Sequence, residues 1–469
     1  MTRNLIVIVA DTLRHPRFFG GTAPAVMPFI QRWSEQGTVL PRLIASSSWT
    51  CPSHVSLLAG VDPWQTHFYL AQSRSALPSS RSLADRWREA GGESVAFSEN
   101  FLVAPELGTA PGYDAYNPGL WARLAGNAQR GVTLLGYEQL LHRVMERSVR
   151  SNESGTRGGR GLRGTGTAVY RLINSMRSGA ELNRALARGL RRRRADRPLH
   201  LFVNFSEPHE PYLLPSEGLG PTSLGHLPSV NLARHTDYLA RTPAGDAFRR
   251  AYLDSVRELD HQVETLVASL NRHGLLRDAM VVFVSDHGQA LGENGFFGHG
   301  HYLHDELIEI PGIVWTYRDG RPERELPPAT DWVDLRHLHD VLADYADGRS
   351  AGLSARFEQS LAARGPAASY WEGPLPRAPA GFLFASERSG VYRQVRLVRG
   401  DQTLTVQDPD GTGPFQSLET PGHAAGPAEM ADEAARYLRI ARGEDGAAAG
   451  NSSSMGREVD DRLRSWGYD

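Results

Sequence analysis

The chain has 469 residues, of which 40% are hydrophobic and 22% charged, and its formal net charge is −2. These proportions are typical of a globular protein with about two or three domains, and they exclude a disordered chain. The near-neutral charge excludes a whole-molecule electrostatic attraction to nucleic acids, so we expect no nucleic-acid partner.

The basic residues and the single cysteine exclude further kinds of catalysis and cross-linking. All 51 residues counted as Lys or Arg are arginine, and the absence of lysine excludes Schiff-base chemistry and a P-loop lysine. Cys51 cannot form an internal disulfide, which fits a reducing compartment. Residues 5–10 form an apolar run that is too short for a signal peptide, and no run of about 18 apolar residues follows. We therefore expect a cytoplasmic protein without a membrane segment.

Apolar β-branched runs alternate with helical patterns along most of the chain. Strands are predicted at residues 5–10, 94–98, 199–205, 279–288 and 310–317. Helices are predicted at residues 27–36, 52–59, 82–90 and 247–273, and longer helical patterns cover 119–150 and 167–194. This alternation predicts an α/β fold with a doubly wound, mostly parallel central sheet flanked by helices.

The composition changes near residue 375. Residues 381–408 contain short alternating strands with turn signals, and residues 428–442 have a helical pattern. We therefore predict a main α/β domain over residues 1–375 and a small C-terminal α+β subdomain with an antiparallel sheet over residues 376–469. Within the main domain, residues 151–166 have no apolar face and are predicted to form a flexible loop.

Polar side chains follow three of the predicted strands. Asp11 and Thr12 follow the first strand, residues 204–212 end and follow another, and Asp286 with His287 ends a third. Ligands of open α/β sheets bind beyond the carboxyl ends of the strands. Asp11, Asp286 and His287 are therefore predicted to bind one divalent metal ion. Two carboxylates and one imidazole favour Mn²⁺ or Zn²⁺, while Ca²⁺ and Mg²⁺ stay open.

The segment SSSWTCPSH, residues 46–54, can supply a hydroxyl to such an ion. Thr50 precedes a predicted helix that has Pro52 in its first turn. A hydroxyl on a divalent cation loses its proton more easily, and an oxyanion at Thr50 would face the free N–H groups of the helix. This pattern predicts Thr50 as a metal ligand and a nucleophile, and a reactive thiol at Cys51 is the competing interpretation.

Four motifs occur in an order and at separations typical of one family. They are NLIVIVADTLR from residue 4, WTCPSHVSLLAG from residue 49, PHEPY from residue 208 and SDHGQALGENGFFGHGH from residue 285. Together they resemble the sulfatase branch of the alkaline phosphatase superfamily, from residue 4 to about residue 317. The resemblance implies the fold of that family, one metal site and an ester-cleaving activity.

The nucleophile motif departs from that of sulfatases proper, which carry C/S-x-P-S-R and convert its first residue to formylglycine. Aligned on Pro52 and the residue after it, the resemblance places Thr50 at the nucleophile position and Cys51 at the variable position. His54 then stands where the family has arginine. Threonine is not a substrate for formylglycine formation, so no formylglycine is expected, and Cys51 becomes a buried spacer.

The resemblance also implies the remaining roles in the site. His209 corresponds to a general acid acting on the leaving group or to a hydrogen-bond donor to the transition state. His299 follows His287 at the spacing at which related phosphonate monoester hydrolases have a lysine, so an imidazole replaces the ammonium that clamps the anion. Further substrate-side residues are implied as well. These are Thr12, His54, Asn100 and His301.

The absence of the lysines that clamp sulfate favours phosphoryl or phosphonyl esters as substrates. We therefore expect a metal-dependent hydrolase that cleaves phosphodiesters or phosphonate monoesters through a covalent intermediate on Thr50. Three alternatives stay open: a phosphotransferase to an alcohol acceptor, a sulfate-ester hydrolase without formylglycine, and a catalytically dead scaffold. The expected partner is a small-molecule ester, and the sequence allows a homo-oligomer.

Overall fold

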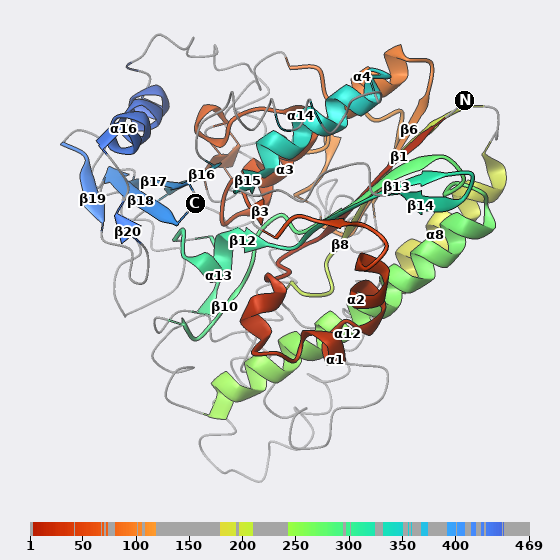
Figure 1. Cartoon of the computed structure of the whole chain (residues 1–469), viewed down its shortest axis with the longest axis horizontal. Coiled ribbons are helices and arrows are strands. Elements are labelled where there is room, and N and C mark those ends of the chain that lie inside the picture. The colour runs from red at the N-terminus through yellow and green to blue at the C-terminus, as the bar shows by residue number, and fades with distance from the viewer. Residues whose placement is uncertain are drawn as a thin grey trace, which may run out of the picture.

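The computed structural model describes residues 3–118, 179–209, 243–349, 367–373 and 392–444, apart from short gaps within these ranges (Figure 1). The loop predicted at residues 151–166, the helical pattern at 119–150 and His301 lie outside the described residues.

A central sheet of eight strands forms the middle layer of the molecule. Its order is β14-β13-β9-β1-β8-β6-β7, and β2 also pairs with β13. The strands are β1 (Asn4–Ala10), β2 (Thr38–Val39), β6 (Glu93–Ser98), β7 (Ala115–Pro118), β8 (Leu199–Phe205), β9 (Ala279–Val284), β13 (Gly312–Arg318) and β14 (Arg321–Glu323). The strands from β9 to β7 run parallel, whereas β13 is antiparallel to β9. The mostly parallel sheet is therefore confirmed.

Helices cover both faces of this sheet (Figure 1). On one face lie α2 (Pro28–Ser34), α8 (Gly179–Arg192) and α12 (Pro243–Arg272); on the other lie α3 (Thr50–Ala59), α4 (Leu83–Glu89) and α14 (Leu335–Ala346). Ile6 and Ile8 of β1 pack on the α12 side, while Leu5 and Val7 pack on the α14 side. A strand buried on both faces must be apolar throughout, which explains the unbroken apolar run at the N-terminus.

Shorter elements connect these layers. They include a small sheet of order β12-β3-β15 and two hairpins, β10-β11 and β4-β5. The short elements are η1 (Pro16–Phe19), α1 (Ala23–Val26), β3 (Leu43–Ile44), η2 (Pro63–Gln65), β4 (Phe68–Tyr69), β5 (Gln72–Ser73), β10 (Ala290–Leu291), β11 (Phe297–Gly298), α13 (Asp305–Ile308), β12 (Glu309–Ile310) and β15 (Val333–Asp334).

A separate, mainly antiparallel sheet is formed near the C-terminus, as predicted. It contains β16 (Ala367–Gly373), β17 (Tyr392–Arg399), β18 (Gln402–Asp408), β19 (Gln416–Leu418) and β20 (Ala424–Ala425), and it packs against α16 (Ala428–Arg442). Strand β16 belongs to this sheet although it precedes residue 375, where the sequence pattern divides the chain. Backbone N–H groups of this strand donate to Ser46 O (2.8 Å) and to Asp334 Oδ2 (3.1 Å), which ties the sheet to the main domain.

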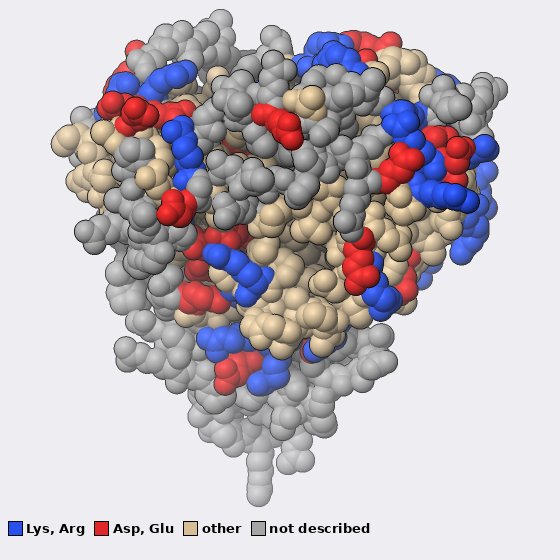
Figure 2. Space-filling model, in the orientation of Figure 1, with Lys and Arg blue, Asp and Glu red and all other residues tan. Residues whose placement is uncertain are grey.

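The face drawn in Figure 2 carries side chains of both charges. Arginine and acidic side chains are interspersed over the face drawn in Figure 2. Among the described helices, none is both long and apolar enough to cross a membrane.

Candidate metal centre and active site

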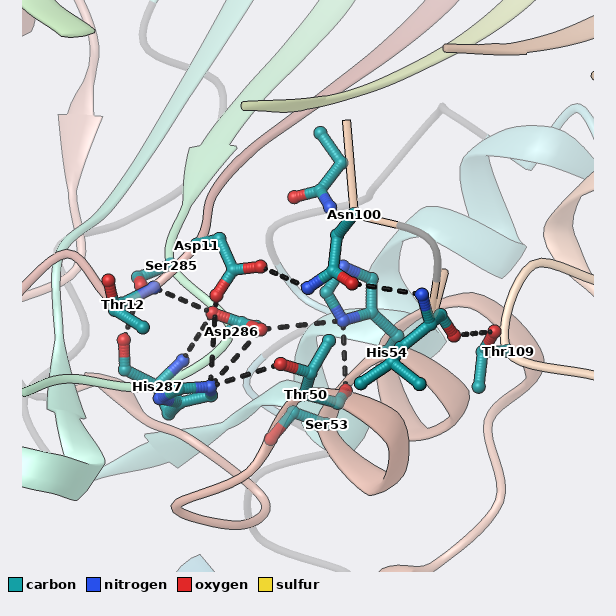
Figure 3. Close-up of polar contacts among 12 residues, drawn as sticks. Asp11, Thr12, Thr50, Ser53, His54, Asn100, Thr109, Ser285, Asp286 and His287 are labelled. Atoms are coloured by element: carbon teal, nitrogen blue, oxygen red, sulfur yellow. Dashed lines mark hydrogen bonds and ion pairs between the residues drawn. The ribbon is translucent and has the colours of Figure 1, made fainter. Parts of the chain in front are cut away.

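The candidate site lies at the carboxyl edge of two neighbouring strands. Asp11 directly follows β1, and Asp286 and His287 follow β9 after one intervening serine. These strands pair in parallel up to Val9 and Val284, so both chain ends arrive at the same place. Figure 3 shows the side chains of Asp11, Asp286 and His287 turned toward one another. The sequence-based grouping of these three residues is therefore found in the fold.

The three side chains form a compact, buried group of potential metal ligands. One ligand atom from each lies within 4.8 Å of the others. His287 Nε2 is 3.8 Å from Asp11 Oδ1 and 3.5 Å from Asp286 Oδ2. His287 Nδ1 is 2.9 Å from Gly288 O, and because a carbonyl only accepts, the proton lies on Nδ1 and the Nε2 lone pair faces the carboxylates. Asp11 Oδ1 is buried and has no hydrogen-bond partner among the described residues, which fits an atom that binds a cation.

The electrostatics of the group also fit a cation. Burial raises the pKa of Asp11 to about 6, and the neighbouring Asp286 carboxylate adds to this rise. Burial raises the pKa of Asp286 to about 7, although backbone N–H groups of Thr12 and His287 donate to it and lower the pKa in part. Two buried carboxylates disfavour each other's ionisation, and a divalent cation between them would reverse that effect.

A strained turn follows Asp11. Thr12 has φ 61°, in the left-handed region that a β-branched residue rarely adopts. Its N–H donates to Asp286 Oδ1 (3.1 Å), and its carbonyl accepts from the hydroxyl of Tyr252 (3.0 Å). Leu13 N donates to Ser285 Oγ (2.9 Å), which holds the turn from the other side. Thr12 thus lies in the site, as predicted, and its buried hydroxyl has no partner in the described part of the chain.

Thr50 lies beside the ligand group at the start of α3. Its Oγ1 is 3.3 Å from His287 Nε2 (Figure 3). The helix begins at Thr50, two positions before the predicted start, so Thr50 belongs to the first turn instead of preceding the helix. Trp49 precedes the helix in extended conformation and gives no side-chain cap, which leaves the first N–H groups of the helix available to an anion.

Cys51 points away from this chemistry. Its side chain is buried in an apolar cluster with Val55, Val61 and Leu102. Burial raises the pKa of the Cys51 thiol above its usual range, and the negative charges of Asp286 and Asp11 raise it further. A thiol without thiolate character is a poor nucleophile, so these surroundings favour the interpretation of Cys51 as a spacer.

Besides Thr12, two further predicted substrate-side residues contact the ligand group itself. Asn100 Nδ2 donates to Asp11 Oδ2 (2.6 Å), and its Oδ1 accepts from Leu102 N (2.9 Å). His54 Nδ1 is 2.9 Å from Thr50 O and 3.6 Å from Asp286 Oδ2. Burial lowers the pKa of His54 to about 4, so this imidazole is neutral. His54 therefore does not carry the charge of the arginine that it replaces in the family pattern.

Two more of the predicted histidines lie on this side of the site: His299 has its ring next to that of His287, and His209 has its ring next to that of His299. The ring centroids of His299 and His287 are 4.7 Å apart, and those of His299 and His209 are 4.8 Å apart. His209 and His299 are half-buried. His299 Nδ1 is 2.8 Å from Oε1 of the buried Gln289, a residue that sequence reasoning did not identify. Three imidazoles from separate segments thus line one side of the site.

Comparison with known proteins agrees with this geometry. The sequence model described as Sulfatase matches residues 3–337, well over half of the chain. The choline-sulfatase of Rhizobium meliloti is 25% identical over 350 residues, which cover 66% of this chain and 63% of that protein. The iduronate 2-sulfatase of Mus musculus is 24% identical over 398 residues, covering 72% of this chain and 66% of that protein. The chain spans slightly less than two thirds of these relatives.

Solved structures show the same fold at lower identity. A 2-O GAG sulfatase superposes with a TM-score of 0.60 at 14% identity, covering 97% of this chain and 96% of that one. The phosphonate monoester hydrolase of Silicibacter pomeroyi superposes with a TM-score of 0.56 at 16% identity, covering 96% and 97%. With the match of the family model, these findings show that the chain belongs to the sulfatase family of the alkaline phosphatase superfamily.

Proposed function

We propose that this protein is a metal-dependent hydrolase of phosphodiesters or phosphonate monoesters that forms a covalent intermediate on Thr50. The observation that carries the proposal is the position of the Thr50 hydroxyl, 3.3 Å from His287 Nε2 and at the start of a helix without a side-chain cap. A hydroxyl beside a metal-binding group and a helix N-terminus has the surroundings that a nucleophile toward an anionic ester needs.

Asp11, Asp286, His287 and the Thr50 hydroxyl would hold one divalent ion, with Mn²⁺ or Zn²⁺ favoured by the imidazole among the ligands. When bound, the ion would lower the pKa of the Thr50 hydroxyl and attract the anionic oxygens of the ester. The neutral His54, 2.9 Å from Thr50 O, holds the first turn of the helix in place behind the nucleophile.

The reaction needs two displacements at phosphorus. Before the first displacement the Thr50 hydroxyl gives its proton to solvent. Thr50 Oγ1 then bonds to phosphorus, the bond between phosphorus and the leaving oxygen breaks, and His209, starting as imidazolium, gives that oxygen its proton. In the second displacement, water loses a proton to the now neutral His209 and attacks phosphorus, and the bond between phosphorus and Thr50 Oγ1 breaks, which restores the deprotonated Thr50 and the His209 imidazolium. His299 has its ring next to those of His209 and His287, and its Nδ1–H donates to Gln289 Oε1. The imidazolium form of His299, which also carries a proton on Nε2, can donate to a non-bridging oxygen of the substrate.

The proposed preference for phosphorus esters over sulfate esters rests on the absence of lysine from the chain. The lysines that clamp sulfate in the family have no counterpart here, because the chain contains no lysine. A phosphonate monoester hydrolase is among the structures that share the fold, while the curated relatives named above are sulfatases. Sulfate esters are therefore the second substrate class to test, and an alcohol in place of water would make the enzyme a phosphotransferase.

The test combines turnover with a trapped intermediate. Metal-loaded protein is assayed on aryl phosphodiesters, phosphonate monoesters, phosphate monoesters and sulfates, with and without an added alcohol. Mass spectrometry of quenched protein should find a phosphoryl or phosphonyl adduct on the peptide that contains residues 46–60.

Substitutions at two neighbouring positions separate the two candidate nucleophiles. Thr50→Ala should lower kcat by about 10³-fold or more and abolish the adduct, while Thr50→Ser keeps a hydroxyl and measurable turnover. Cys51→Ala is the matched control and should leave turnover nearly unchanged. Full activity of Thr50→Ala would rule out the covalent mechanism, and turnover of sulfates alone would rule out the substrate class.

A further inference from the structure

A short segment after His299 packs against the turn that carries His287. This segment, residues 303–309, contains α13 and leads into β12. Gly288 N donates to Leu307 O at 2.7 Å. A Cβ on Gly288 would lie 2.1 Å from Glu306 O, so only glycine permits this approach of two backbones. The position of residues 303–309 therefore determines where the His287 turn can lie.

The other side of this segment is held by the C-terminal sheet. Gln394 of β17 accepts a hydrogen bond from Leu303 N through Oε1 (3.1 Å). Arg396 of the same strand donates through Nη1 to Leu303 O (2.7 Å) and forms an ion pair through Nη2 with Asp305. Arg396 is only 3% exposed, so its charge depends on these partners. Figure 1 shows α13 between the central sheet and the C-terminal sheet.

The same aspartate, Asp305, also contacts η1, the short helix that follows the candidate metal ligand Asp11. Arg17 Nη2 is 3.3 Å from Asp305 Oδ2 and 2.6 Å from Glu309 Oε1. Asp305 thus joins a residue of the C-terminal sheet, Arg396, to a residue near the first strand end, Arg17. Residues 303–309 therefore contact the segment that follows Asp11 through Asp305, and the turn that carries His287 through Leu307.

We propose that Arg396 and Gln394 are positioning residues, through which the C-terminal sheet holds residues 303–309 and thereby the His287 turn of the active site. The proposal rests on the proposed function only for its kinetic consequence. Attachment of the sheet does not depend on these two side chains, because Tyr370 N donates to Ser46 O (2.8 Å) and Ala368 N to Asp334 Oδ2 (3.1 Å). The side chains of Arg396 and Gln394 instead bind residues 303–309 directly.

Strand β17 offers a matched control. Arg393 is also buried, but its Nη1 pairs with Asp408 Oδ2 (3.2 Å) within the C-terminal sheet. We compare Arg396→Met and Gln394→Met with Arg393→Met by hydrogen–deuterium exchange of the full-length protein. Amide exchange of peptides covering residues 303–309 should rise in the first two variants. In Arg393→Met the rise should be confined to β18 and its neighbours.

The kinetic arm measures kcat and KM separately on whichever ester the wild-type protein turns over. Arg396→Met should lower kcat/KM by about 2- to 30-fold, Arg396→Lys should recover part of the loss, and Arg393→Met should change kcat/KM little. Unchanged exchange at residues 303–309 in both Arg396→Met and Gln394→Met would overturn the proposal, as would an equal rise in Arg393→Met. Absence of phosphoryl turnover in the wild type would contradict the proposed function and not the positioning role. The exchange experiment would still decide whether Arg396 and Gln394 position residues 303–309.

Discussion

The carboxylate of Asp11 uses its two oxygens for different purposes. Oδ2 accepts from Asn100 Nδ2 at 2.6 Å, while Oδ1 faces His287 Nε2 and has no hydrogen-bond partner among the described residues. A hydrogen bond to one oxygen fixes the plane of the carboxylate and so aims the other oxygen. Asn100 therefore orients a candidate metal ligand, which is a different role from the substrate contact that the family resemblance implies.

Loss of this hydrogen bond should weaken metal binding. Asn100→Ala is expected to lower the affinity for Mn²⁺ or Zn²⁺ by about 10- to 100-fold, the usual effect of removing a partner of a ligand. The affinity is measured by competition with a chelator of known strength. Ser98→Ala is the control, because Ser98 Oγ bonds the backbone of Asn100 without touching Asp11. Equal losses in both variants would contradict the orienting role.

The candidate metal ligands could be grouped from the sequence because Asp11, Asp286 and His287 lie just beyond the ends of two recognisable strands. Tyr252 and Gln289 could not be predicted in the same way. Tyr252 occupies an apolar position of α12, so the pattern indicates only a core residue, whereas its hydroxyl donates to Thr12 O in the folded protein. Gln289 contacts His299 across a hairpin, and no local pattern records such a contact.

At the scale of elements, α3 connects the proposed nucleophile Thr50 to the packing of the domain. The helix is buried along its whole length and ends at Gly60, which has φ 66°. A Cβ at Gly60 would lie 2.5 Å from the ring of His339 in α14. His339 is itself held by its Nδ1, 2.8 Å from Leu57 O, so the ring has little freedom to move away. The end of α3 therefore requires glycine for two independent reasons.

Comparison of Gly60→Ala with Gly274→Ala should separate the cost of the left-handed backbone from the cost of the collision with His339. Gly274 has φ 69°, but a Cβ there meets nothing within 4 Å. Gly274→Ala should lower the free energy of unfolding by about 1–2 kcal/mol, the cost of left-handed backbone. Gly60→Ala should lower it by about 1–3 kcal/mol more, because the methyl group also collides with His339. Urea denaturation measures both values, and equal losses would show that the ring yields.

Element boundaries and directions were predictable only in part. The five predicted strands of the main domain all exist, yet the apolar pattern of residues 310–317 is the same for either direction, and β13 runs antiparallel. Helix α14 is missing from the predicted elements although its apolar residues keep helical spacing, and the burial of its His337 and His339 is not visible in that pattern. Strand direction and buried polar positions depend on tertiary contacts, which lie beyond local pattern.

At the scale of the whole molecule, the buried carboxylates connect metal binding to folding. The pKa values of Asp11 and Asp286 in the metal-free protein, about 6 and about 7, lie above the ordinary value of 3.8. Between about pH 4 and pH 7 the folded state therefore binds more protons than the unfolded state. By linkage, this contribution to the stability of the metal-free protein is present at low pH and is lost as the pH rises through this window.

Metal binding should counteract this loss, and its effect should grow with pH. A cation needs both carboxylates ionised, so each proton that it displaces below the pKa costs about 1.4 kcal/mol per pH unit. The gain in the free energy of unfolding on adding Mn²⁺ or Zn²⁺ should thus be larger at about pH 8 than at about pH 5.5. Urea unfolding with and without metal measures the gain at each pH. Asp11→Asn combined with Asp286→Asn should abolish both the gain and its pH dependence, whereas an equal gain at both pH values in the wild type would show that these carboxylates do not bind the ion.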